Sequence, residues 1–338
     1  MNGKGEALLS VRDLKTHFMM DEGVVKAVDG VSFDVYSGQI FGIVGESGCG
    51  KSVTMKSLLG IVEAPGRIVH GSILLRRDGG QIDLARLNPK GREIRAIRGG
   101  QIALIPQEPM ASFSPVHTIG DQIIETIMLH QAVDKKAARA SALELLKSVG
   151  IPMPERRLDE YSWQLSGGLR QRAIIAMALS CNPRILIADE PTTAVDVTTQ
   201  AQVLRLLRDL QRERDSAIIF ITHDLGVIAQ MASFVMVMYL GLVMEQGPVD
   251  VIFHSPKHPY TQALLRSIPS ISSAPRVDLP TISGSIPHPF NKPKGCPFHP
   301  RCIKRMPGKC DAKTPALQAA GDNQLVSCFL YHDVEVPA

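Results

Sequence analysis

The residues with the clearest capacity for chemistry form a glycine-rich loop. Residues 45–52 read GESGCGKS, which fits the pattern G-x-x-x-x-G-K-[ST], follows an apolar run and opens a helical pattern. Backbone N–H groups in such a loop, together with a helix N-terminus, favour a bound phosphate. We expect Lys51 to reach the terminal phosphates of a nucleotide and Ser52 to ligate Mg²⁺. The predicted nucleotide contacts here are Gly45, Glu46, Ser47, Gly48, Cys49, Gly50, Lys51, Ser52 and Val53.

One residue of this loop is a cysteine with its own expected chemistry. Cys49 lies near the predicted helix start, where the local field should lower the pKa of its thiol. We therefore expect alkylation of Cys49 to block nucleotide turnover, and bound nucleotide to protect it. Cys181, by contrast, lies in an apolar helical pattern and is expected to be inert core.

A second candidate site is an acidic pair at the end of an apolar run. Residues 185–191 read ILIADEP. A strand that ends in two carboxylates would bring Asp189 to the Mg²⁺ shell at the edge of a sheet where ligands collect. Glu190, beside it, is placed to orient or deprotonate an attacking water molecule.

The elements that must position these groups alternate along residues 8–247. The candidate strands are residues 39–44, 184–188 and 217–221. Residues 134–150 are typical of a helix that begins at Asp134 and stops at Gly150. Strands that alternate with helices indicate an α/β fold with a largely parallel sheet. The longest apolar stretch, 227–244, is interrupted by polar residues and glycine, so we expect buried strands there instead of a membrane span.

Composition places the chain among globular proteins. Of 338 residues, 44% are hydrophobic and 21% are charged, and the net charge is +4. That balance does not indicate disorder, a fibre or a nucleic-acid-binding protein. The N-terminus lacks the apolar run of a signal peptide, so we expect a cytosolic chain whose six cysteines are mostly reduced or metal-bound.

Residues 165–172 read LSGGLRQR, and this motif resembles the signature of the ABC ATPase family. The resemblance covers roughly residues 8–247. It implies an α/β, P-loop ABC-type nucleotide-binding domain over 1–250, with a helical subdomain at about 108–166. One position departs from the family pattern, because Leu169 stands where a glutamine is frequent. The similar importers vary at that position, so we do not expect the change to inactivate the protein.

The resemblance implies roles for residues outside the loop. Glu190 would be the general base, and Asp189 a Mg²⁺ ligand. Gln107 would sense Mg²⁺ and couple to membrane subunits, and His223 would contact the γ-phosphate. An ordinary core position is the alternative for His223 and for Phe18. The further implied nucleotide contacts are Phe18, which would stack on adenine, the signature residues Ser166, Gly167 and Gly168, and Asp196 in the loop 193–196.

The signature itself implies a dimer. A Ser-Gly-Gly turn that opens a helix is a second anion-binding N-terminus, and nothing in the sequence places it on its own P-loop. In the family, two such domains meet head to tail, and each signature covers the ATP bound to the other domain. ATP then holds the dimer together and hydrolysis releases it.

Beyond residue 250 the composition changes. Fourteen of the 23 prolines lie at or beyond Pro248, which disfavours long helices and central strands. We predict a loop-rich module over 251–338. Its HPYTQALL and GCPFHPRC motifs resemble the C-terminal extension of dipeptide and oligopeptide importer ATPases, a branch that includes nickel and some oligosaccharide importers.

Four cysteines in this module are spaced C-x5-C-x7-C-x17-C and are predicted to hold a metal staple. They are Cys296, Cys302, Cys310 and Cys328. The family resemblance implies a [4Fe-4S] cluster on these residues. Zn²⁺ is the first alternative, although structural zinc sites usually use closely spaced cysteine pairs. Two disulfides are the second alternative, and the cytosol disfavours them.

The resemblance implies an ATPase that powers the import of dipeptides, oligopeptides or a related solute. Its expected partners are a second ABC ATPase subunit, two transmembrane permease subunits and an extracytoplasmic solute-binding protein. The expected location is the cytoplasmic face of the cell membrane, as a peripheral subunit. The alternatives are the ATPase of an oligosaccharide or nickel importer, a soluble non-transport ABC ATPase, and a P-loop kinase or GTPase. LSGGLRQR and His223 argue against the last alternative.

Overall fold

The computed structural model describes residues 5–108, 112–193, 196–268, 282–321 and 323–332. The chain divides into two compact units. Unit 1 comprises Met1–Glu6, Val35–Gln39 and Leu87–Ile221, and unit 2 comprises Ala7–Asp34, Ile40–Arg86 and Thr222–Ala338. The boundary that we predicted near residue 250 falls at the start of a helix within unit 2 and stays a prediction.

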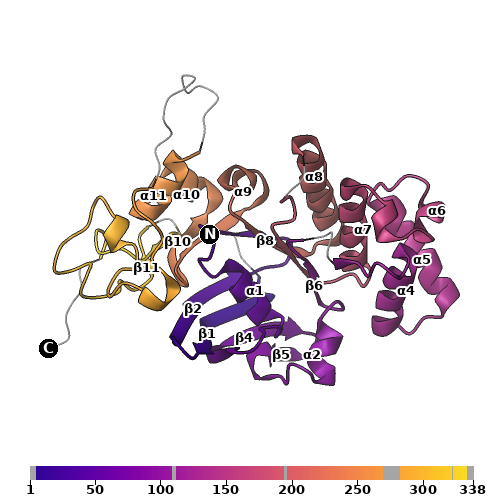
Figure 1. Ribbon diagram of the computed structural model, residues 1–338, viewed down its shortest axis with the longest axis horizontal. Helices are drawn as coiled ribbons and strands as arrows, with labels where there is room; N and C mark the ends of the chain where they lie inside the picture. Colours follow the sequence, from indigo (N-terminus) through magenta and orange to yellow (C-terminus); the bar gives the residue numbers. More distant parts are fainter. Residues whose placement is uncertain (1–4, 109–111, 194–195, 269–281, 322, 333–338) are drawn as a thin grey trace. The chain divides into compact units, whose positions relative to one another are not determined.

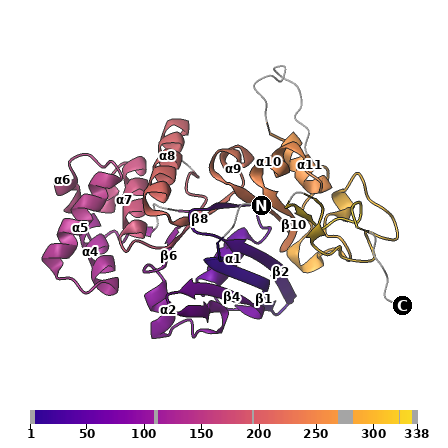
Figure 2. The same ribbon diagram turned by 180° about the vertical axis from the view of Figure 1, so that it is seen from behind.

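Unit 2 contains an antiparallel sheet in the order β2-β1-β4-β5. The strands are β1 (Leu9–Met20), β2 (Gly23–Val35), β4 (Gly66–Arg77) and β5 (Gly80–Asp83), followed by the short helix η1 (Leu84–Arg86). Apolar side chains alternate inward at the start of β1, so that Leu9 and Val11 are buried. The pairing with β4 is irregular between Arg12 and Lys15, and Leu14 is the next buried residue. Helix α1 (Lys51–Leu58) lies beside this sheet, where the hydroxyls of Ser57 on α1 and Thr16 on β1 are 2.7 Å apart (Figure 2).

A second set of strands in unit 2 is ordered β11-β12-β10-β9-β3. The strands are β3 (Ile40–Val44), β9 (Phe234–Tyr239), β10 (Leu242–Pro248), β11 (Gln318–Ala319) and β12 (Leu325–Val326). β3 is parallel to β9, and its five residues are all buried. The apolar stretch 227–244 ends α9 (Leu225–Met231) and then forms β9 and the start of β10. The buried strands that we predicted are therefore confirmed from residue 234 onward, whereas residues 227–231 are helical.

The C-terminal part of unit 2 is rich in loops (Figure 1). After α10 (Val249–His254) and α11 (Pro259–Arg266), the described residues form only η3 (Pro289–Asn291), η4 (His299–Arg301), β11 and β12. None of these four elements is longer than three residues. Proline removes backbone donors and fixes φ, which explains the lack of longer elements.

Unit 1 contains three parallel strands, β6 (Ile102–Ile105), β7 (Ile185–Asp189) and β8 (Ala217–Thr222). Its helices are α2 (Arg92–Ile97), α4 (Ile119–His130), α5 (Lys135–Ser148), α6 (Pro154–Leu158), η2 (Ser162–Gln164), α7 (Gly167–Leu179) and α8 (Val197–Arg214). Helices α4 to α7 pack against one another as a helical cluster (Figure 1).

The helix that we predicted over 134–150 is confirmed as α5. The Asp134 side chain accepts a hydrogen bond from the Ala137 N–H and caps the helix. Gly150 follows the last turn with a φ of +73°, the conformation typical of a glycine helix stop. Among the described residues, no helix is long and apolar enough to cross a membrane.

Candidate functional site

The glycine loop follows strand β3 and leads directly into helix α1. Two positions in this loop require glycine, because backbone atoms of other segments lie too close to leave room for a side chain. A Cβ on Gly45 would lie 2.2 Å from the Met238 carbonyl oxygen, and one on Gly50 would lie 2.3 Å from that of Ala27. Gly50 also has a φ of +105°, which side chains disfavour. The loop therefore has the strand–loop–helix context that phosphate binding requires.

Lys51 is the first residue of α1 and is 5% exposed. Its ammonium donates hydrogen bonds to the carbonyl oxygens of Gly45, at 2.8 Å, and Glu46, at 3.1 Å. The loop thus turns its carbonyl groups toward Lys51. A phosphate that contacts this ammonium would be held by charge as well as by backbone N–H groups.

The structure corrects the expectation for Cys49. The side chain is buried, with 3% exposed, and burial raises the pKa of its thiol, while the nearby Lys51 acts in the opposite direction. Desolvation therefore outweighs the helix start that we expected to lower the pKa. The lowered pKa expected from the sequence is therefore wrong. The expected block of turnover by alkylation, and its prevention by nucleotide, stay predictions, although a neutral thiol is a poor nucleophile.

The acidic pair lies at the end of β7 in unit 1. Asp189 is 3% exposed and is the last residue of the strand. Glu190 follows with a φ of +47°, an uncommon backbone conformation for a residue other than glycine. Its N–H donates to the Ile221 carbonyl oxygen at 2.8 Å. Such strain at the end of a strand is frequent at functional sites, because surrounding contacts must hold it in place.

Two side chains bind the Glu190 carboxylate in unit 1. The Gln107 amide donates to Oε2 at 3.2 Å, and the Thr193 hydroxyl donates to the same oxygen at 3.0 Å. The structure therefore brings together Gln107 and Glu190, two predicted site residues that are 83 positions apart. The sequence interpretation gave Thr193 no role toward Glu190, because a threonine in a loop carries no distinctive signal.

The signature residues lie at the start of α7. Ser166 is the N-cap residue, but its side chain makes no capping hydrogen bond. Ser166 and Gly167 are both exposed, so their polar groups are accessible at the helix N-terminus. Gly168 lies near Thr199, whose methyl carbon would be 3.4 Å from an added Cβ. This exposure is compatible with contact to a second chain.

Asp196 has a clear structural role. It caps α8, and its carboxylate accepts hydrogen bonds from the Thr199 hydroxyl, at 2.6 Å, and the Thr199 N–H, at 2.9 Å. These bonds lower the pKa of Asp196. Of the loop 193–196, residues 194 and 195 lie outside the described residues. The predicted contact of Asp196 with nucleotide stays a prediction.

Phe18 and His223 lie in unit 2. Phe18 is half-buried near the end of β1, and an added Cβ on its strand partner Gly66 would lie 2.6 Å from the Phe18 ring. One side of that ring therefore packs against Gly66. His223 follows directly after β8 and is exposed, which excludes the alternative of a buried core histidine.

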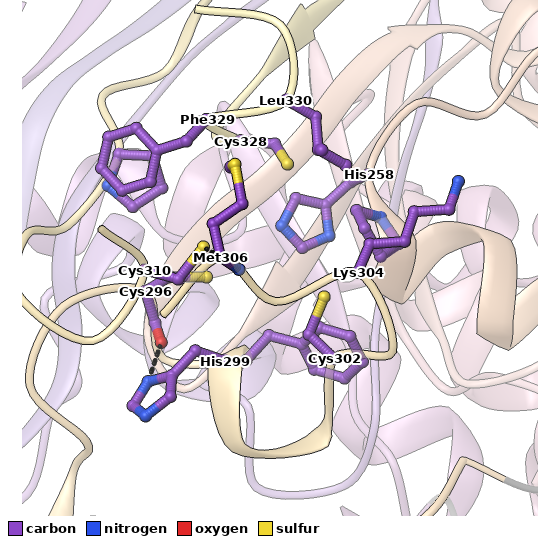
Figure 3. A pocket seen from close by; sticks show the side chains of 13 residues that line it. His258, Cys296, His299, Cys302, Lys304, Met306, Cys310, Cys328, Phe329 and Leu330 are labelled. Atoms are coloured by element: carbon purple, nitrogen blue, oxygen red, sulfur yellow. Dashed lines mark hydrogen bonds between the residues drawn. The ribbon is translucent and has the colours of Figure 1, made fainter. Parts of the chain in front are cut away.

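Four cysteines of the C-terminal region line one cavity in unit 2. Figure 3 shows the sulfur atoms of Cys296, Cys302, Cys310 and Cys328 facing a common space beside Met306 and His258. All four are free thiols, as are the other two cysteines, which disfavours the disulfide alternative.

Burial raises the pKa of three of these thiols: that of Cys296 to about 12, that of Cys328 to about 11, and that of Cys302 in the same direction. The proximity of the cysteines to one another raises these pKa values further. Lys304 acts in the opposite direction on Cys302, but burial is the largest cause of the shift there. A bound metal would supply the positive charge that thiolates need in this buried place.

A single metal ion is one candidate occupant of the cysteine cavity. Among the described residues, no group of three or more His, Cys, Asp or Glu side chains is arranged to hold one metal ion. Four thiolates on one Zn²⁺ would have to converge at about 2.3 Å from it.

The sequence interpretation missed a further contact. Arg301, in the motif GCPFHPRC, forms an ion pair with Glu46 of the glycine loop, with 2.7 Å between Nη1 and Oε2. Tyr260, in the motif HPYTQALL, also contacts Glu46, through its hydroxyl. An arginine beside a predicted ligand cysteine gives no signal by itself, because its partner lies 255 positions away.

Comparisons with known proteins identify similar chains. A family model described as "ABC transporter" matches residues 28–193, and one described as "Oligopeptide/dipeptide transporter, C-terminal region" matches residues 244–310. The chain is 48% identical over 326 residues to the dipeptide transport ATP-binding protein DppD of Bacillus subtilis (strain 168), which covers 96% of this chain and 95% of the relative. It is 44% identical over 322 residues to DppD of Escherichia coli (strain K12), with 95% and 96% covered.

A solved structure is also similar. It is a dimeric post-hydrolysis state of the ATP-binding cassette MJ0796 bound to ADP and Pi. The TM-score is 0.63 at 26% sequence identity, and the match covers 71% of this chain and 98% of the other.

Proposed function

Because this chain belongs to the ATP-binding subunits of ABC transporters, in the branch with the oligopeptide/dipeptide transporter C-terminal region, we propose that it powers the import of dipeptides or oligopeptides. The family and the α/β P-loop fold class predicted from the sequence are confirmed. The chain is an ABC-type ATPase, which excludes the alternatives of a P-loop kinase or GTPase, and its relatives disfavour the alternative of a non-transport ABC protein.

The observation that best supports hydrolysis is the hydrogen bond from Gln107 to Glu190. A general base must lie within hydrogen-bond reach of the attacking water and must itself be oriented. Gln107 and Thr193 fix one oxygen of the Glu190 carboxylate. In this proposal the carboxylate takes a proton from water as the water attacks the γ-phosphorus of ATP, and ADP leaves.

The remaining charges stabilise the phosphoryl group. Lys51 would hold the β- and γ-phosphates, and His223 would contact the γ-phosphate. Mg²⁺, when bound, would neutralise phosphate charge, and Ser52, Gln107 and Asp189 are the oxygen donors that suit this ion. Asp189 fits that role because it is a nearly buried carboxylate at the carboxyl end of a parallel strand.

We further propose that the signature of a second ATPase subunit completes the site. Ser166 and Gly167 are exposed at the start of α7, where N–H groups favour an anion. The family relation supports a head-to-tail pair, with a related ATPase chain as the second subunit. Two permease subunits and a solute-binding protein complete the proposed importer, with this chain peripheral at the cytoplasmic face of the membrane.

For the cysteine cavity we propose a [4Fe-4S] cluster held by Cys296, Cys302, Cys310 and Cys328. The donor set supports this group, since four cysteines line one buried cavity. These four side chains would hold the cluster as thiolates. The group would serve as a structural staple for a segment with few regular elements.

Phosphate release from ATP by the purified chain tests the enzymatic part of the proposal. We expect Mg²⁺-dependent turnover that Lys51→Ala abolishes, while Glu144→Gln, on the surface of α5, leaves it intact. Turnover that survives Lys51→Ala would contradict the assigned site.

Uptake of a labelled dipeptide by cells that express the complete importer tests the solute. Competition by unlabelled peptides, and none by Ni²⁺ or oligosaccharides, is the expected result. Competition by Ni²⁺ or a saccharide alone would assign the chain to the alternative solute. Iron and sulfide near four per chain, after anaerobic purification, would support the cluster, and zinc near one would replace it.

A further inference from the structure

The Arg301–Glu46 ion pair joins the C-terminal extension to the glycine loop within unit 2. The guanidinium forms two bonds with the carboxylate, from Nη1 to Oε2 at 2.7 Å and from Nη2 to Oε1 at 3.0 Å. The Arg301 side chain is 5% exposed and that of Glu46 is 22% exposed. A two-bond pair with so little exposure is geometrically specific and weakly screened by salt.

Other groups hold the Arg301 side chain in this position. Its Nε donates to the Ser283 carbonyl oxygen at 3.1 Å, and Nη1 also donates to the Tyr239 hydroxyl at 3.3 Å. The guanidinium lies within 6.0 Å of the centres of the Tyr239 and Phe298 rings. Arg301 ends the short helix η4, which begins three residues after Cys296 and is followed directly by Cys302. Two lining cysteines of the cavity therefore flank the arginine along the chain.

A second contact reaches the same loop residue. The Glu46 N–H donates to the hydroxyl oxygen of Tyr260 on α11 at 3.0 Å. The Tyr260 ring packs against Phe298, with 5.2 Å between ring centres, and against Tyr239, with 4.8 Å. The extension thus contacts Glu46 at both its backbone and its carboxylate, from two separate segments.

The backbone carbonyl group of Glu46 helps to position Lys51. The Glu46 carbonyl oxygen accepts a hydrogen bond from the Lys51 ammonium, as does the carbonyl of the preceding Gly45. A glycine-rich loop gains much backbone freedom when nothing holds it, and ordering it on binding costs free energy. Contacts that hold Glu46 in place reduce that cost before the ligand arrives.

We propose that Arg301 and Tyr260 are positioning residues for the glycine loop 45–52, the P-loop. Docking of the cysteine-containing extension then raises the affinity for nucleotide. The proposal rests on the proposed function, because it requires that the P-loop binds ATP. Coupling between two sites is reciprocal, so ATP must strengthen the docking of the extension by the same factor. The arginine acts through Glu46 and touches no reacting group.

The direct experiment measures ATP affinity of the full-length chain by titration calorimetry, without turnover, in Arg301→Ala, Glu46→Gln and the double variant. We expect each single change to weaken ATP binding about tenfold, within the range typical of coupled sites. The double variant should bind as weakly as either single variant, because both changes remove the same contact. Arg301→Lys, which keeps one charge–charge bond, should restore part of the affinity.

The chain offers a matched control. Lys292, also in the extension, forms an ion pair with Asp29 of β2 at 3.0 Å, and both side chains are about as exposed as that of Glu46. Lys292→Met therefore removes a link between the extension and the strands without touching Glu46. It should leave ATP affinity within about twofold of the wild type, well below the coupling expected for Arg301.

A second readout separates positioning from general stability. Amide hydrogen exchange of residues 296–305 should slow when ATP binds to the wild type and should respond less in Glu46→Gln, which keeps every cysteine. Tyr260→Phe, which removes only the hydroxyl, provides a milder change if Arg301→Ala fails to fold.

The outcomes are distinct for the two proposals. A wild type that binds no ATP contradicts the proposed function. A wild type that binds ATP, with unchanged or tighter binding in Arg301→Ala and Glu46→Gln, overturns this inference and leaves the function intact. Additive effects in the double variant would also overturn it, since the two residues would then act independently.

Discussion

The P-loop and the cysteine cavity both lie in unit 2, but they are built in opposite ways. The P-loop joins a buried strand to a helix, and its backbone groups carry the chemistry within eight consecutive residues. The cysteine cavity draws its four sulfurs from positions 296 to 328, along a segment whose regular elements are at most three residues long. Close packing shapes the first site, whereas the second is a set of side chains on loops.

The two sites are therefore expected to be sensitive to different kinds of substitution. A loop shaped by close backbone approach tolerates no added atom at its tight positions. A loop-rich module is destabilised mainly by substitutions that remove a group linking its segments. The ion pair of Arg301 with Glu46 joins the segment that carries the cysteines to the P-loop. Changes in that segment are therefore expected to affect nucleotide binding.

The largest expected effect comes from adding one methyl group to the P-loop. Gly45→Ala places a Cβ 2.2 Å from the Met238 carbonyl oxygen and 2.7 Å from the Cys49 sulfur. We expect ATP affinity, measured by calorimetry, to fall by more than about 100-fold, since backbone must move to relieve such overlap.

Gly48→Ala is the matched control for this prediction. An added Cβ there meets nothing within 4 Å, although the φ of +77° still costs about 1–2 kcal/mol. Equal loss of affinity in both variants would show that backbone conformation, and not close approach, governs the loop.

The next effect concerns the cysteine cavity. With the proposed cluster bound, Cys310→Ser should lower the free energy of unfolding by about 2–3 kcal/mol, because a structural metal group contributes directly to folding. Urea unfolding with far-UV circular dichroism measures the change. Cys181→Ser, in unit 1 and away from the cavity, should change it by less than about 1 kcal/mol. An equal free energy of unfolding in the two variants would contradict a structural role for the cysteine cavity.

A smaller effect concerns the reactivity of Cys49. Because burial raises the pKa of its thiol, the thiolate is scarce at neutral pH, and its fraction rises about tenfold per pH unit below that pKa. Alkylation with iodoacetamide, followed by peptide mass spectrometry, should therefore be slow at pH 7 and should accelerate with each unit of rising pH. Rapid labelling at pH 7 that ATP prevents would restore the expectation from the sequence.

The smallest effect serves as a reference for Arg301. Arg139 on α5 also pairs with a carboxylate, that of Asp159, at 2.9 Å, but their side chains are 47% and 65% exposed. We expect Arg139→Ala to change the free energy of unfolding by less than about 1 kcal/mol and to leave ATP affinity unchanged. A loss of affinity as large as in Arg301→Ala would mean that burial does not distinguish the two pairs.

Much of the fold could be predicted from periodicity and from residues with special backbone roles. The helix from Asp134 to Gly150 carries its start and stop signals, and the buried strand before Gly45 is a short apolar run next to a turn. These features are local, so a single sequence displays them.

Part of the site could not be predicted, because it depends on contacts between distant residues. Burial of Cys49 reverses the effect expected from its place near a helix start, and burial depends on the whole fold. The hydrogen bond of Thr193 with Glu190 and the ion pair of Arg301 with Glu46 join ordinary residue types. Only the three-dimensional arrangement gives these residues a role.

In the proposed function, Glu190 is the base of an ATPase whose ATP-bound form is a dimer. The most direct measurement is phosphate release together with the molecular mass in solution, for wild type and Glu190→Gln in Mg-ATP. We predict that Glu190→Gln lowers turnover by about 10²–10⁴-fold, binds ATP and accumulates as a dimer with its ATPase partner. Full turnover in Glu190→Gln would contradict the assignment.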